Sequence, residues 1–149
     1  VLMDIFPSAL LVYIRRDPVY IMQSILLARE KFYGDRNLWW SVKPPEYEEI
    51  KDLDRFHQVA GQVYFTERSI QSALDAMDER HKMVIDYQAF CESPPAAARG
   101  LEGKYADLGC PIEIAGDLPE RLESRNTVRL DKGDIEKLEA AYASFAGSA

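Results

Sequence analysis

The feature that most constrains the fold is an apolar run that ends in two arginines. Residues 9–14 read Ala-Leu-Leu-Val-Tyr-Ile, with Pro7 before them and Arg15 and Arg16 directly after them. A continuous apolar run of this length, β-branched toward its end, is typical of a strand that a parallel sheet buries on both faces. We therefore expect the chain to contain at least part of a layered sheet.

A helix is predicted to follow this strand after a very short turn. Asp17 is an N-cap residue, and Pro18 stands at the first helical position, where no amide proton is needed. The helix is predicted over residues 18–33, with Gly34 ending it. Strand, turn and helix together make half of a βαβ unit.

The rest of the chain continues the alternation of helix and strand. The expected elements are an irregular segment at 35–45, a helix at 46–78, a strand at 83–87, a helix at 94–108 capped by Ser93, an irregular stretch at 111–129 and a helix from Asp131 to 145. Two strands among long helices indicate an α/β domain that is predominantly helical. Because two strands cannot cover helices this large, we expect further strands in a missing N-terminal segment or in a partner chain, such as a homo-oligomer's second copy.

The composition argues against several classes of function. The 149 residues fit one domain, and the net charge of −7 argues against binding to nucleic acid or to an anionic membrane. No apolar run approaches the length of a membrane span, and no signal peptide is visible. Cys91 and Cys110 have neither metal-ligand spacing nor a disulfide framework, so we expect no metal and a cytoplasmic location.

Arg16 and Ser24 are the strongest candidates for a binding site. Arg16 ends the first predicted strand, at the sheet edge where α/β proteins bind ligands, and its guanidinium can hold two phosphate oxygens. Ser24 lies eight residues further on, nearly two helical turns along, and can donate to a third oxygen. Because Asp17 already caps the helix, a phosphate is expected beside the helix and not at its tip.

Residues 12–24, which read Val-Tyr-Ile-Arg-Arg-Asp-Pro-Val-Tyr-Ile-Met-Gln-Ser, resemble the 3′-phosphate-binding motif of sulfotransferases. The strand at 83–87 and the Ser93-Pro94-Pro95 helix start resemble the later part of the same family. The resemblance implies a partial three-layer, P-loop-like domain, with residues 1–149 as its C-terminal portion. It also implies sulfuryl transfer from 3′-phosphoadenylyl sulfate (PAPS) to a hydroxyl or amine on a small molecule, glycan or peptide.

The same resemblance assigns roles to four residues. Arg16 and Ser24 would hold the 3′-phosphate, Tyr87 would stack on the adenine ring, and Arg125 would add a second positive charge. The family's donor-gripping Pro-Lys-Ser-Gly-type loop and its catalytic base have no counterpart in this sequence. The chain is therefore expected to be inactive alone, with its catalytic residues in a missing part, while residues 32–58 help to shape the acceptor side.

Two other classes of function stay open from the sequence. One is a phosphoryl transferase of kinase-like architecture, although the sequence contains no Gly-rich phosphate loop. The other is a non-enzymatic helical interaction module that pairs through the long amphipathic helix. Three side chains have both a functional and a structural interpretation: Arg16 as a solvated strand end, Tyr87 as a core aromatic, and His57 as a general base or an ordinary surface histidine.

Overall fold

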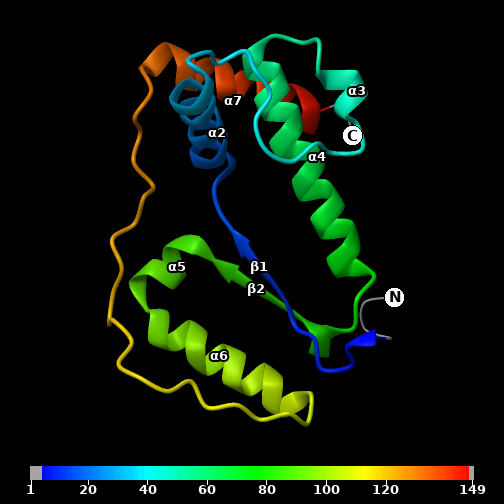
Figure 1. Cartoon of the computed structure of the whole chain (residues 1–149), viewed down its shortest axis with the longest axis vertical. Helices are drawn as coiled ribbons and strands as arrows, with labels where there is room; N and C mark the ends of the chain where they lie inside the picture. Colours follow the sequence, from blue (N-terminus) through cyan, green and yellow to red (C-terminus); the bar gives the residue numbers. More distant parts are fainter. Residues whose placement is uncertain (1–4, 148–149) are drawn as a thin grey trace. The chain divides into compact units, whose positions relative to one another are not determined.

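The computed structural model describes residues 5–147 and shows an α/β fold in which helices predominate (Figure 1). In chain order the elements are β1 (Leu11–Arg15), α2 (Pro18–Tyr33), α3 (Tyr47–Ile50), α4 (Arg55–Asp75), the 3-10 turn η1 (Glu79–His81), β2 (Lys82–Asp86), α5 (Tyr87–Glu92), α6 (Pro94–Asp107) and α7 (Lys132–Ala146). They form two compact units, which are described separately. Unit 1 comprises residues 5–16 and 74–126, and unit 2 comprises residues 17–73 and 127–147. The expectation of a single domain stays a prediction.

Unit 1 is built on a two-stranded parallel sheet. β1 and β2 pair from Leu11 opposite Lys82 to Arg15 opposite Asp86, so their carboxyl ends share one edge. α6 lies close to β2, because a Cβ atom added at Gly100 would come within 2.6 Å of the Met83 Cε atom. Glycine thus allows the close approach of this helix to the strand.

The prediction that the first strand is buried on both faces is wrong for the described residues. Val12 and Ile14 of β1 are 40% and 48% exposed, and Val84 of β2 is 50% exposed. A parallel sheet is normally covered on both faces, but the packing of α5 and α6 against β2 leaves these side chains partly exposed. The apolar residues of both strands therefore retain unburied surface within residues 5–147.

Unit 2 contains α2, α3, α4 and α7, and three of these helices share a continuous apolar core. α2, α4 and α7 contribute the inward-facing side chains, and Leu130 precedes α7. The buried core members are Met22, Leu26, Val59, Ala60, Val63, Leu130, Leu138 and Ala141. The apolar side of α7 faces this core, since Leu138 is fully buried and Ile135, Tyr142 and Phe145 pack against the core.

Capping residues define the ends of two helices as the sequence predicts. The Asp17 carboxylate accepts a hydrogen bond from the Val19 amide, and Gly34 ends α2 with φ of 69°. The Asp131 carboxylate accepts from the Asp134 amide at the start of α7. Both helices begin where a side chain replaces the missing intrahelical acceptors.

The single long helix predicted over residues 46–78 is wrong. The helix is interrupted at residues 51–54, between α3 and α4, and Leu53 in this interruption is 40% exposed. The Asp54 carboxylate accepts hydrogen bonds from the amides of Phe56 and His57 and starts a new helix. A local N-cap therefore overrides the apolar periodicity of the segment.

The second strand also ends earlier than predicted. The Asp86 carboxylate accepts hydrogen bonds from the Gln88 and Ala89 amides and caps α5, a helix that the sequence pattern does not predict. Tyr87 is consequently the first residue of α5 and not the last residue of a strand. Ser93 stands at the N-cap of α6 as predicted, but its side chain makes no capping hydrogen bond.

Candidate functional site

Arg16 follows the last residue of β1, and side chains from distant parts of unit 1 orient it. Its Nε donates to Oδ1 of Asn126 at 2.7 Å, and its Nη2 donates to the backbone oxygen of Arg125 at 2.8 Å. Its Cζ atom lies 4.6 Å from the centre of the Tyr87 ring. The amide oxygen, the carbonyl oxygen and the ring are neutral groups, so these three contacts orient the guanidinium without cancelling its charge.

Tyr87 also contacts the segment that contains Arg125. As the first residue of α5 it lies directly after β2, and its hydroxyl oxygen accepts a hydrogen bond from the Arg125 amide at 3.0 Å. Three of the four predicted site residues, Arg16, Tyr87 and Arg125, therefore come together at the carboxyl edge of the sheet. The contacts of Arg125 in this cluster are made by its backbone.

The predicted stacking of Tyr87 on adenine has a geometric constraint. Arg16 already covers one face of the ring, so a base would have to use the opposite face or displace the guanidinium. The stacking role stays a prediction. Asn126, which accepts a hydrogen bond from Arg16, is not among the predicted site residues. The one signal for it in the sequence is that its side-chain amide stands next to the predicted Arg125.

Ser24 lies in unit 2, on the second turn of α2. Its hydroxyl donates to the backbone oxygen of Tyr20 at 2.7 Å, one turn back along the helix. A serine hydroxyl has one hydrogen, so donation to a phosphate would require this bond to be given up. The convergence of Ser24 with Arg16 stays a prediction.

A pocket in unit 1 is formed by α5 and by the segment that directly precedes Arg125. Its volume is about 390 Å³. The lining residues come from α5 and from the segment that precedes Arg125, namely Gln88, Cys91, Glu92, Arg121, Leu122, Glu123 and Ser124. The Leu122 amide donates to the Cys91 backbone oxygen at 2.7 Å, and Ser124 Oγ donates to Gln88 Oε1 at 2.9 Å, so two hydrogen bonds hold the segment on α5.

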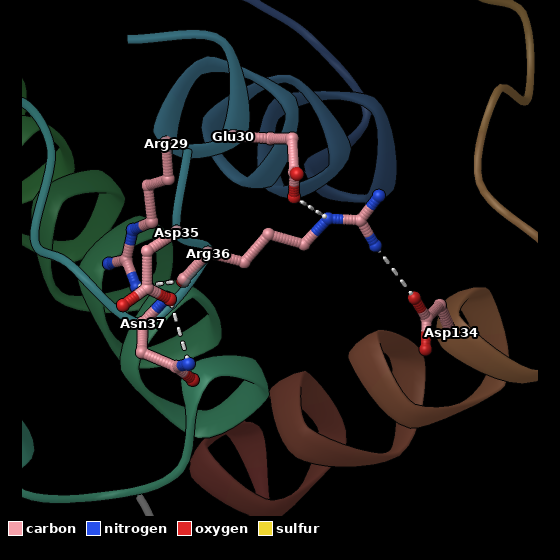
Figure 2. Close-up of polar contacts among 6 residues, drawn as sticks. All are labelled: Arg29, Glu30, Asp35, Arg36, Asn37 and Asp134. Atoms are coloured by element: carbon pink, nitrogen blue, oxygen red, sulfur yellow. Dashed lines mark hydrogen bonds and ion pairs between the residues drawn. The ribbon is translucent and has the colours of Figure 1, made fainter. Parts of the chain in front are cut away.

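A separate polar network anchors the loop after α2 in unit 2 (Figure 2). Arg36 donates through Nε to Glu30 at 2.8 Å and through Nη1 to Asp134 at 3.2 Å, which ties the loop to α2 and α7. In the same loop the Asp35 carboxylate accepts from the amide and side chain of Asn37. These ion pairs are internal, and they give this network a structural role.

His57 is paired with Asp54 on the exposed first turn of α4. Its Nδ1 bonds to Asp54 Oδ2, and the side chains are 43% and 56% exposed. Within residues 5–147 no group of three His, Cys, Asp or Glu side chains is arranged to hold a metal ion. In the same part of the chain, none of the helices combines the length and apolar character that a membrane crossing requires.

The Asp54–His57 pair gives a prediction about pH. Burial acts to raise the pKa of Asp54, but hydrogen bonds from the His57 ring and from the Phe56 and His57 amides outweigh it and lower the pKa. A depressed folded-state pKa stabilises the fold above the unfolded value near 3.8, and this contribution is lost as pH falls through the lower folded value. NMR titration of the Asp54 carboxyl is expected to give a midpoint below 3.8 that rises in His57→Ala. An unchanged midpoint in that variant would contradict the assignment.

Comparisons with models of protein families, with curated proteins and with solved structures found no match to this chain.

Proposed function

We propose that this chain is the part of a sulfotransferase that binds the 3′-phosphate of PAPS, with Arg16 as the principal ligand of that phosphate. The observation that carries the proposal is the position of Arg16, immediately after β1 at the carboxyl edge of a parallel sheet. Ligands of open α/β sheets bind beyond this edge. The neutral contacts from Asn126 and from the Arg125 carbonyl support a guanidinium that is already oriented.

The proposed reaction moves a sulfuryl group from PAPS to a hydroxyl or amine acceptor and leaves adenosine 3′,5′-bisphosphate. In this proposal Arg16 holds the 3′-phosphate through charge-assisted hydrogen bonds, and Ser24 contributes a further donor. Tyr87 offers the ring face opposite Arg16 to the adenine, and Arg125 adds charge near the site. No catalytic residue is assigned within the chain, which is expected to bind the nucleotide without turning it over.

Calorimetric titration of the full chain with matched adenosine nucleotides tests this proposal. Adenosine 3′,5′-bisphosphate is expected to bind at least about tenfold more tightly than adenosine 5′-monophosphate, because charge-assisted hydrogen bonds to the 3′-phosphate contribute about 1.5–3 kcal/mol. ATP binding at equal or higher affinity would favour a kinase-like phosphoryl transferase. No nucleotide binding, together with a stable dimer in sedimentation, would favour the helical interaction module.

A further inference from the structure

Arg29 on α2 is the most deeply buried charged side chain described in unit 2. It is 0% exposed and is the largest of the fully buried side chains within residues 5–147. Burial lowers the pKa of Arg29 to about 10, so the guanidinium stays protonated at neutral pH. Arginine is rarely buried completely without a partner of opposite charge, because an unpaired buried charge is strongly destabilising.

The hydrogen bonds of Arg29 leave one edge of the guanidinium unused. Nη1 donates to Oε1 of Gln58 at 2.9 Å and to the backbone oxygen of Arg36 at 3.3 Å, and both acceptors are neutral. Nε and Nη2 are buried and have no acceptor among the described residues, and no ion pair joins Arg29 to a carboxylate there. Nε–H and one Nη2–H point in the same direction, which is the geometry that binds two oxygens of one acidic group.

Trp39 adds another unused donor next to Arg29. The Arg29 Cζ atom lies 5.4 Å from the Trp39 ring centre, and the indole Nε1 is buried with no acceptor in the described chain. Buried N–H groups normally have acceptors. Two buried donor groups, the Nε–Nη2 edge of Arg29 and the indole of Trp39, therefore lie near each other without acceptors among the described residues.

We propose that the Nε–Nη2 edge of Arg29 binds a small oxyanion, a carboxylate, sulfate or phosphate group, beneath the loop that joins α2 to α3. Two anion oxygens would accept from Nε and Nη2, and the negative charge would offset the buried guanidinium. Gln58 fixes the guanidinium plane from the opposite side, since its own Nε2 donates to the backbone oxygens of Lys51 and Leu53. This site belongs to unit 2 and is independent of the proposed nucleotide site at Arg16.

The loop between α2 and α3 would have to open to admit the anion to Arg29. Its backbone is held by neutral hydrogen bonds, from Gln62 Nε2 to the oxygens of Trp40 and Val42, both at 2.8 Å. Between them Ser41 has φ of 74°, in the left-handed region that is unfavourable for a residue other than glycine. Opening the part of the loop around Ser41 would break these two neutral hydrogen bonds, while the ion pairs of Arg36 with Glu30 and Asp134 hold the start of the loop in place.

Thermal unfolding of the full chain in different sodium salts at constant ionic strength tests the site. Acetate, sulfate or phosphate is expected to raise the Tm saturably over chloride, by roughly 5 °C when the anion far exceeds its Kd. Arg29→Met should remove this dependence, whereas Arg15→Met, a change at an exposed arginine, and Arg16→Ala should retain it. The chain has two tryptophans, so the fluorescence of Trp40→Phe should report the same saturation through Trp39.

NMR of the Arg29 Nε–H in the wild type gives a second readout if Arg29→Met does not fold. The resonance should shift with the same saturation midpoint as the Tm. The proposal is overturned if none of the three anions differs from chloride in either readout, or if the effect persists in Arg29→Met. It is also overturned if Glu46, whose buried Oε2 has no donor in the described chain, is the partner. In that case Glu46→Gln and Arg29→Met would lower the free energy of unfolding by equal amounts, and the double variant would lose less than the sum of the two.

Discussion

Replacing Leu138 with alanine is expected to lower the free energy of unfolding by about 3 kcal/mol. Leu138 is 0% exposed on α7 and belongs to the core cluster that includes Leu26 of α2 and Val59 of α4. A buried leucine shortened to alanine loses apolar burial and leaves a cavity, with measured losses of about 2–5 kcal/mol in other proteins. Urea unfolding followed by circular dichroism measures the change.

Val128→Ala is the matched control for this prediction. Val128 lies in unit 2 before α7, and its side chain is 58% exposed. Its shortening should change the free energy of unfolding by less than about 0.5 kcal/mol. If Leu138→Ala were as mild as the control, Leu138 would not lie in a continuous core.

Replacing Arg16 with alanine is expected to weaken the binding of adenosine 3′,5′-bisphosphate by about 10–100-fold. Hydrogen bonds to a charged group contribute about 1.5–3 kcal/mol, and each tenfold change in Kd corresponds to about 1.4 kcal/mol. Arg15→Ala is the matched control, because Arg15 is an exposed neighbour whose side chain leaves the strand on the opposite face. Calorimetry measures both variants.

If Arg16 binds the 3′-phosphate, Arg16→Ala must weaken nucleotide binding more than Arg15→Ala does. Equal losses in Arg15→Ala and Arg16→Ala would indicate general attraction by positive charge, and no loss in either would place the nucleotide elsewhere. Unfolding curves of both variants provide the check on folding, since Arg16 also contacts Asn126 and Tyr87.

The elements that the sequence predicts well are those whose ends depend on local chemistry. α2 runs from Pro18 to Tyr33 as predicted, because Asp17 and Gly34 are capping residues within the segment itself. The break before α4 is not predicted because the apolar spacing continues across it and conceals the N-cap at Asp54. α5 is not predicted because Asp86 both ends β2 and caps α5, and the strand pattern conceals its capping role.

The candidate site was predictable only where strand order determines position. Parallel pairing of β1 with β2 brings Arg16 and Tyr87 to one sheet edge, so their proximity follows from the predicted topology. The contact of Arg16 with Asn126 joins residues 110 positions apart through an irregular segment, for which the sequence has no periodic signal. The unpaired Nε and Nη2 atoms of Arg29 are not predictable either, because the position of a residue on a helix does not show which acceptors surround its side chain.

The most direct test of the central claim is a thermodynamic cycle between Arg16 and the 3′-phosphate. Calorimetry would give four Kd values, for wild type and Arg16→Ala, each with adenosine 3′,5′-bisphosphate and with adenosine 5′-monophosphate. If Arg16 binds the 3′-phosphate, the preference for the bisphosphate should be at least about tenfold in wild type and should nearly vanish in Arg16→Ala. An equal preference in both proteins would contradict the assignment.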